Sequence, residues 1–176
     1  KYCFASTGDF GGGRKLLSAE TGKKAIDFLL KYSKGRKNLE LDFFGGEPLM
    51  NFDVVKEVVN YARSKEEEYN KNFRFTITTN GVLLDDDKID FINKEMSNVV
   101  LSIDGRKEIN DQLRPAVNGK GSYDVIVPKY QKLVANRGKN PGDYDQYYVR
   151  GTFTKHNLDF SEDVFHLNEL GFDQVS

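Results

Sequence analysis

The stretch Leu39-Glu40-Leu41-Asp42-Phe43-Phe44-Gly45-Gly46-Glu47-Pro48-Leu49 indicates the fold of this chain. A β-rich run ends there at two glycines, an acid and a proline. Because glycine has no Cβ atom, a ligand can approach the bare backbone of Gly45 and Gly46. Glu47 can bind an ammonium group by charge-assisted hydrogen bonds, and Pro48 restricts the exit from the turn. The turn therefore suits a zwitterionic, amino-acid-like ligand, and its alternative is a tight strand-to-helix connection without a ligand.

Further strand-like and helix-like segments alternate along the chain, which predicts βα units and a parallel sheet. We expect strands at residues 39–44, 73–79, 99–103, 147–153 and 172–176. Their short apolar and β-branched runs suit strands that are covered on both faces. We expect helices at residues 21–32, 53–69, 88–93, 123–136 and 162–170.

Several local signals refine the predicted helices. The segment 21–32 has one apolar face, formed by Ala25, Phe28, Leu29 and Tyr32, which is typical of an amphipathic helix. Asn51 is a plausible N-cap for the second helix. Pro128 is expected to delay or bend the start of the helix at 123–136. Gly138 and Gly171 stand where helix C-caps are expected.

Composition excludes several functional classes. The chain has 176 residues, 38% of them hydrophobic and 30% charged, and its net charge is −1. This length suits one domain, and the charge gives no bias toward nucleic acid or anionic membranes. No apolar run approaches the roughly 20 residues that span a bilayer, and no signal peptide is visible. The single cysteine excludes an internal disulfide framework and favours a cytoplasmic location.

Four motifs resemble those of radical S-adenosylmethionine (SAM) enzymes. Lys1-Tyr2-Cys3-Phe4 resembles the end of their Cys-x-x-x-Cys-x-aromatic-Cys loop, and Phe44-Gly45-Gly46-Glu47-Pro48 resembles their SAM-amine motif. Thr78-Thr79-Asn80-Gly81 and Leu101-Ser102-Ile103-Asp104-Gly105 are similar to strand-end motifs of the SPASM-type branch, which modifies peptides and proteins. The runs 42–51 and 95–102 are most similar to maturases of six-cysteine peptides, which make thioether crosslinks (sactipeptides).

This resemblance implies a parallel partial (β/α)6 TIM-like barrel, truncated at its N-terminal strand and cluster loop. Residues 1–176 would form an incomplete radical SAM catalytic core, with further domains outside this chain. In parallel barrels, the C-terminal ends of the strands and the loops that follow them carry the chemistry. All the strand-end motifs quoted above lie at such ends of predicted strands, which agrees with the resemblance.

The resemblance also implies cofactors and the residues that hold them. Cys3 would be the third thiolate ligand of a [4Fe–4S] cluster, and Tyr2 would lie near the adenine of SAM. Gly45, Gly46 and Glu47, with Pro48 closing the turn, would hold the SAM amine. Ser102 and Arg114 are candidates for the SAM carboxylate or ribose, because an arginine fork suits a carboxylate. The remaining candidates, as supporting, turn or weaker site residues, are Asn80, Asp104 and Thr154.

The implied activity is reductive cleavage of SAM to a 5′-deoxyadenosyl radical that modifies a ribosomal precursor peptide, forming a Cys thioether crosslink. The expected partners are a cysteine-rich precursor peptide and an electron donor of the flavodoxin or ferredoxin type, with neither nucleic acid nor membrane. One alternative is an anaerobic sulfatase-maturing enzyme that forms formylglycine. From another class, a non-redox TIM-barrel hydrolase could use Glu47 and Asp104 as paired carboxylates. A third alternative is a binding domain without redox chemistry.

Overall fold

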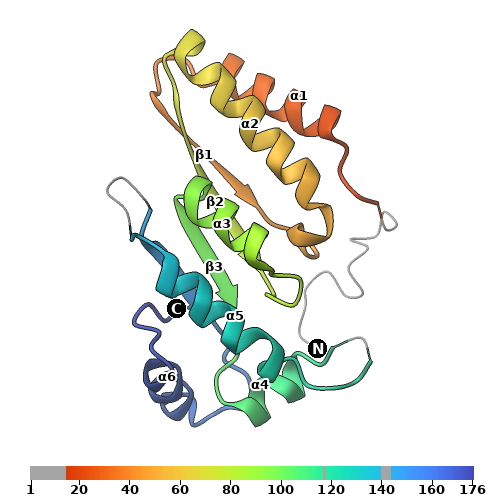
Figure 1. Cartoon of the computed structure of the whole chain (residues 1–176), viewed down its shortest axis with the longest axis vertical. Helices are drawn as coiled ribbons and strands as arrows, with labels where there is room; N and C mark the ends of the chain where they lie inside the picture. The colour runs from red at the N-terminus through yellow and green to blue at the C-terminus, as the bar shows by residue number, and fades with distance from the viewer. Residues whose placement is uncertain (1–14, 117, 140–143) are drawn as a thin grey trace.

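The computed structural model describes residues 15–116, 118–139 and 144–176, which form a parallel sheet that alternates with helices (Figure 1). The strands are β1 (Asn38–Phe43), β2 (Asn72–Thr79), β3 (Asn98–Ser102) and β4 (Gln146–Arg150), and they are adjacent in that order. The helices are α1 (Ala19–Tyr32), α2 (Phe52–Tyr69), α3 (Asp86–Glu95), α4 (Lys107–Leu113), α5 (Tyr123–Asn136) and α6 (Phe160–Glu169), with a 3₁₀ turn η1 at Pro48–Asn51. The predicted parallel α/β class is therefore confirmed.

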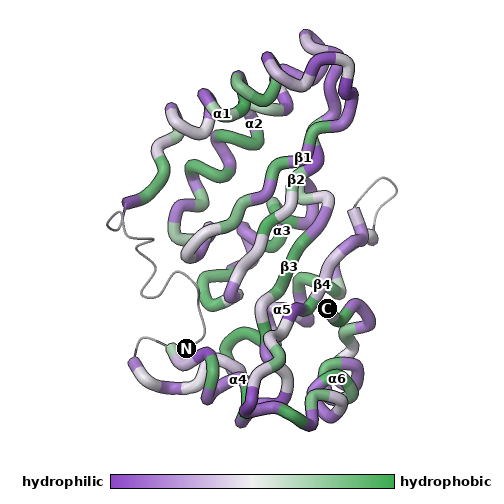
Figure 2. Tube along the Cα trace, turned by 180° about the vertical axis from the view of Figure 1, so that it is seen from behind, coloured by the Kyte–Doolittle hydropathy of each residue, from purple (hydrophilic) through white to green (hydrophobic). Residues whose placement is uncertain are grey.

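Apolar and polar residues alternate along β1 and β2, as the hydropathy colours of the trace in Figure 2 indicate. Because successive side chains of a strand point to opposite faces of the sheet, the two faces differ in chemistry. One face carries the apolar side chains that form the core with the helices: Leu39, Phe73, Phe75, Ile77, Val99, Leu101 and Val149. The opposite side is mostly polar and more exposed, and we call it the open face; it is formed by Glu40, Asp42, Arg74, Thr76, Thr78, Asn98, Val100, Ser102, Tyr148 and Arg150. The expectation of cover on both faces is thus met on one face only within the described residues.

The last predicted strand is reduced to an isolated parallel bridge between Val149 and Val175. The amide of Val149 donates to the carbonyl of Gln174 at 2.8 Å, and the amide of Ser176 donates back to Val149 at 2.9 Å. The predicted position beside β4 and the parallel direction are confirmed, although the paired segment is shorter than expected. Similarly, β4 ends at Arg150 rather than at Phe153.

Of the apolar face predicted for α1, Leu29 packs against the core, but the rest of the prediction was wrong. The buried residues of α1 are Gly22, Ile26 and Leu30, whereas Phe28 and Tyr32 are 64% and 58% exposed. Gly22 explains why α1 turns a different face toward α2 than predicted. A Cβ atom at Gly22 would lie 2.4 Å from Val58, so the bare backbone of α1 lies directly against α2. The apolar arc of α1 is wider than the surface that α2 and the sheet cover, and periodicity alone did not identify the covered part.

Other helix predictions had mixed outcomes. Asn51 does not cap α2 with its side chain; its amide group donates to the carbonyl of Leu17 at 2.8 Å instead. α5 begins at Tyr123 and contains Pro128 in its interior, so its start is not delayed. Gly138 and Gly171 follow their helices with φ values of 67° and 91°, as expected for C-caps. The short helix α4 was not predicted.

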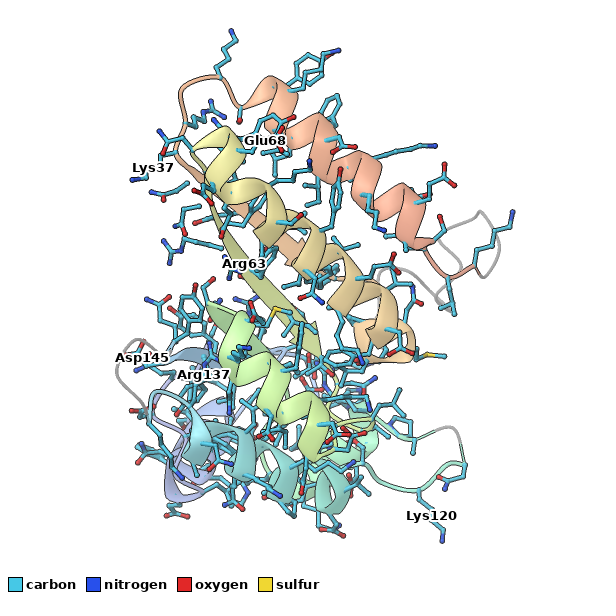
Figure 3. The ribbon with its side chains drawn as sticks, turned by 45° about the horizontal axis from the view of Figure 1, so that its top comes forward. Lys37, Arg63, Glu68, Lys120, Arg137 and Asp145 are labelled. Atoms are coloured by element: carbon cyan, nitrogen blue, oxygen red, sulfur yellow. The ribbon has the colours of Figure 1, made fainter. Side chains whose placement is uncertain are left out.

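Two arginines close the N-terminal end of the sheet (Figure 3). Arg63 donates to the carbonyl of Phe73 at 2.8 Å, and Arg137 donates to the carbonyls of Gln146 and Met96, both at 2.7 Å. These contacts satisfy backbone groups where β2, β3 and β4 begin. In the part of the chain that the structure describes, no helix is both long and apolar enough to cross a membrane.

Candidate active site

The turn after β1 presents open backbone, as predicted. Gly45 has φ of 140°, which a residue with a side chain rarely adopts. At Gly46 the backbone needs no such freedom, yet a Cβ atom added there would meet no atom of the described residues within 4 Å. No described residue fills the space beside Gly46, and such open backbone is the feature that the proposed SAM-amine contact requires.

Glu47 joins this turn to the end of the neighbouring strand. Its Oε1 atom accepts hydrogen bonds from the hydroxyl group of Thr79 at 2.7 Å and from the amide of Leu49 at 3.0 Å. Its Oε2 atom accepts from the amide of Asn80 at 2.8 Å. Burial raises the pKa of Glu47 above its ordinary value, although these three hydrogen bonds act in the opposite direction. Glu47 thus carries a partly desolvated carboxylate that would gain from a nearby cation.

Asn80 contacts Glu47 through its backbone rather than its side chain. The side-chain Oδ1 atom accepts from the amide of Val82 at 3.1 Å, which shapes the turn after β2. Two predicted site residues, Glu47 and Asn80, are therefore brought into direct contact. Sequence reasoning did not foresee that the hydroxyl group of Thr79 links them.

At the end of β3, Asp104 and Arg114 form a bidentate ion pair. Arg114 Nε and Nη2 lie 2.8 Å and 3.3 Å from Asp104 Oδ2 and Oδ1, respectively. Asp104 Oδ1 also accepts from the amide of Thr152 at 2.9 Å. Asp104 is buried, so Arg114 compensates a charge that would otherwise be costly. The structure thus brings together Asp104 and Arg114, and it ties the end of β3 to the segment after β4.

Ser102 and Thr154 occupy different surroundings. Ser102 lies on the open face in register with Arg150 of β4. Thr154 takes part in a local turn, in which its amide and hydroxyl groups donate to Asn157 Oδ1 at 2.7 Å and 2.9 Å. Ser102 therefore lies at the predicted edge with the other site residues, whereas the contacts of Thr154 describe the shape of its own loop.

Tyr130 is a supporting residue that sequence reasoning missed. From α5, its hydroxyl group lies 3.1 Å from the carbonyl of Ser102 and 3.3 Å from the carbonyl of Thr79, between the ends of β3 and β2. Its side chain is fully buried, and burial raises its pKa. A Cβ atom at Gly81 would lie 2.2 Å from this ring, so the turn after β2 rests directly on it. The available signal was a polar-tipped tyrosine on an otherwise apolar helix face.

The predicted cluster ligand Cys3 and the predicted adenine neighbour Tyr2 lie outside the described residues. Among residues 15–116, 118–139 and 144–176, no group of three or more His, Cys, Asp or Glu side chains could hold a metal ion. The described site fits the amino-acid part of SAM. Glu47, in the open turn after β1, is bonded to the end of β2, and Arg114 is paired with Asp104 after β3. A carboxylate pair for hydrolysis is not supported, since Glu47 and Asp104 are each bound by protein donors.

Comparison with known proteins shows the same family. Residues 1–158 match the model of the radical SAM superfamily. The chain is 33% identical over 136 residues to the cysteine-type anaerobic sulfatase-maturating enzyme of Clostridium novyi, covering 75% of this chain and 36% of that protein. It is 24% identical over 185 residues to the radical SAM cyclopropyl synthase TigE of Paramaledivibacter caminithermalis, covering 97% of this chain and 37% of that protein.

A solved structure has the same fold. The structure of native anSMEcpe with bound AdoMet (SAM) and the Kp18Cys peptide superposes with a TM-score of 0.81 at 18% identity. The match covers 99% of this chain and 45% of that chain. The partial TIM-like barrel is therefore confirmed as the fold, and the chain spans less than half the length of the relatives described here.

Proposed function

This chain belongs to the radical SAM superfamily, whose enzymes bind a [4Fe–4S] cluster and SAM, and we propose that it forms the SAM-binding core of a peptide-modifying enzyme. The observation that carries this proposal is the open turn at Gly45 and Gly46, held to the end of β2 by Glu47. When bound and reduced, the cluster supplies the electron that cleaves SAM and yields a hydrogen-abstracting 5′-deoxyadenosyl radical.

The residues of this chain would bind and orient the methionyl part of SAM. Gly45 and Gly46 offer backbone carbonyls to the ammonium group, and the desolvated carboxylate of Glu47 adds charge complementarity.

Ser102 and Arg114 are proposed to face the carboxylate or ribose, with Asn80 and Asp104 holding their turns in place. Cys3 is the proposed cluster ligand in this chain, Tyr2 the proposed adenine neighbour, and Thr154 a further candidate.

The proposed substrate is a cysteine-rich precursor peptide, in which the enzyme forms a Cys thioether crosslink. Support comes from the motifs at residues 42–51 and 95–102 and from relatives that act on or bind cysteine-containing partners. Formylglycine formation is the second candidate, because a cysteine-type sulfatase-maturating enzyme is among the relatives. An electron donor of the flavodoxin or ferredoxin type would complete the system.

Substitution of Cys3 tests the core of this proposal. In the complete enzyme, which would supply the other cluster cysteines, Cys3→Ala should abolish both cluster absorbance and the release of 5′-deoxyadenosine. Retention of SAM cleavage in that variant would contradict the proposed role of Cys3. The intact enzyme is then incubated with a cysteine-rich precursor peptide encoded beside its gene. Mass spectrometry separates the two candidate reactions, because a thioether crosslink keeps the sulfur whereas formylglycine formation from cysteine loses it.

A further inference from the structure

Arg150 is the last residue of β4 and lies on the open face, beside the proposed SAM site. Its neighbours in β4, Tyr147 and Val149, belong to the core on the other face. Alternation therefore places Arg150 on the same face as Tyr148. The sheet register pairs Arg150 with Ser102, a proposed SAM contact. Arg150 lies outside the four sequence motifs that resemble those of radical SAM enzymes.

The backbone around Arg150 is held firmly against the end of β3. The amide of Ile103 donates to the carbonyl of Arg150 at 3.0 Å, and the amide of Thr152 donates to Asp104. Between these contacts, a Cβ atom at Gly151 would lie 2.9 Å from the carbonyl oxygen of Ile103. A glycine is thus needed for β4 to approach β3 this closely, and the position of Arg150 relative to Ser102 is defined.

The guanidinium group of Arg150 differs from those of most other arginines in the described residues, although exposed Arg36, which precedes β1, likewise forms no ion pair with them. Arg63, Arg74, Arg106 and Arg114 each form ion pairs with carboxylates, and Arg137 binds backbone carbonyls. For Arg150, no ion pair occurs within the part of the chain that the structure describes. Its Nε atom donates to the hydroxyl group of Ser176 at 3.3 Å. Arg150 therefore contributes an uncompensated positive charge at the C-terminal edge of the sheet.

Resting on the proposed function, we propose that Arg150 binds the carboxylate of SAM from the strand next to Ser102. The charge at this edge changes from the acid Glu47, beside β2, to the arginine at β4, as a zwitterionic ligand requires. Adjacent strands are about 4.8 Å apart, a distance that an arginine side chain easily spans. Because Asp104 neutralises Arg114, Arg150 supplies the net charge that attracts the carboxylate, and its planar fork suits that group.

SAM binding to the complete, cluster-loaded enzyme tests this role by equilibrium titration. Arg150→Gln should weaken SAM binding about ten- to a hundredfold, the usual range for losing a hydrogen bond to a charged group. Arg150→Lys should retain part of the affinity. Decarboxylated SAM, which lacks the carboxylate, should bind the wild type and Arg150→Gln equally. Arg36→Gln is the control, because Arg36 is exposed and precedes β1 at the opposite end of the sheet.

Two outcomes would overturn the proposal for Arg150. One is an unchanged SAM affinity in folded Arg150→Gln, which would also result if the arginine bound an acidic group of the peptide substrate instead. The other is a loss for decarboxylated SAM as large as the loss for SAM. A wild-type enzyme that fails to bind SAM would instead contradict the proposed function itself, so the two failures are distinguishable.

Discussion

The hydroxyl group of Thr79 donates a hydrogen bond to Glu47 Oε1 at 2.7 Å, and this contact joins the end of β2 to the turn after β1. The amide of Asn80 reinforces it from the same strand end. Glu47 is therefore both a candidate for the SAM ammonium and the residue that holds two strand ends together. Its two functions can be separated experimentally.

Glu47→Ala should reduce both stability and SAM affinity. Leaving the Asn80 amide and the Thr79 hydroxyl without their acceptor should lower the free energy of unfolding by about 1–3 kcal/mol. Loss of the charged partner should weaken SAM binding about ten- to a hundredfold. Chemical denaturation and equilibrium SAM titration measure the two effects. The matched control is Glu57→Ala, which removes a half-exposed partner of Lys23 and should change SAM affinity little; equal effects of both variants would contradict this account.

The raised pKa of Glu47 predicts how SAM binding depends on pH. The ammonium group favours the ionised carboxylate, so SAM affinity should fall as the pH is lowered through this raised pKa. That fall should begin at a higher pH than the ordinary value of 4.5 would give. Titrations across this pH range should show the effect in the wild type, and Glu47→Gln should lack it. The same pH dependence in both proteins would exclude Glu47 as its source.

In the protein without SAM, the free energy of unfolding should depend on pH in the opposite direction to SAM affinity. A pKa raised by folding adds stability that is complete below 4.5 and is lost as the pH rises through the raised value. The unfolding free energy of the wild type relative to Glu47→Gln should therefore decrease over that window. Denaturation at several pH values provides the measurement, and an increase over the same window would contradict the burial of Glu47.

Gly81→Ala should be markedly more destabilising than Gly119→Ala. The two glycines have nearly the same positive φ, 75° and 77°. A Cβ atom at Gly119 would meet none of the residues that the structure describes within 4 Å, whereas a Cβ atom at Gly81 would clash with the Tyr130 ring. Both substitutions cost about 1–2 kcal/mol of backbone strain, and the clash should add roughly 1–3 kcal/mol at Gly81. Denaturation of both variants measures the difference, and equal losses would show that the turn does not rest on Tyr130.

Arg137→Met should destabilise the fold without affecting the proposed site. The substitution removes the arginine donors from the carbonyl of Met96, a buried contact, and from that of Gln146, a partly buried one. Burial lowers the pKa of Arg137 to about 10. We expect a loss of about 2–4 kcal/mol by chemical denaturation. Folded Arg137→Met should bind SAM normally, and exposed Arg36→Met should be nearly neutral. A neutral Arg137→Met would show that these carbonyls do not need the arginine.

The sequence predicted the strands and the chemical character of their C-terminal ends, because both depend on local patterns. It did not predict which groups meet across strands, since the contact between Glu47 and Thr79 depends on how β1 and β2 are aligned. The sequence also did not predict which face of α1 is covered. Its contact with α2 depends on Gly22, and the pattern of Phe28 and Tyr32 was equally apolar.

The role of Tyr130 and the pairing of Arg114 with Asp104 have the same explanation. Tyr130 meets the ends of β2 and β3 only in the folded sheet, and Arg114 meets Asp104, ten residues earlier, only once α4 has formed between them. A tyrosine on an apolar helix face and an arginine after a strand are common features, so neither predicted its partner. The residues Tyr2 and Cys3 carried much of the resemblance, and their predicted roles stay predictions.

The central claim is that the open turn after β1 holds SAM, and Gly46→Val tests it most directly. A Cβ atom at Gly46 would meet no atom of the described part of the chain within 4 Å, so the variant should fold and load its cluster normally. It should nevertheless exclude the ligand, and equilibrium titration of the complete, cluster-loaded enzyme should detect little or no SAM binding. Gly35→Val, at another exposed turn with the same open surroundings, should bind SAM like the wild type. Wild-type SAM affinity in folded, cluster-loaded Gly46→Val would contradict the claim.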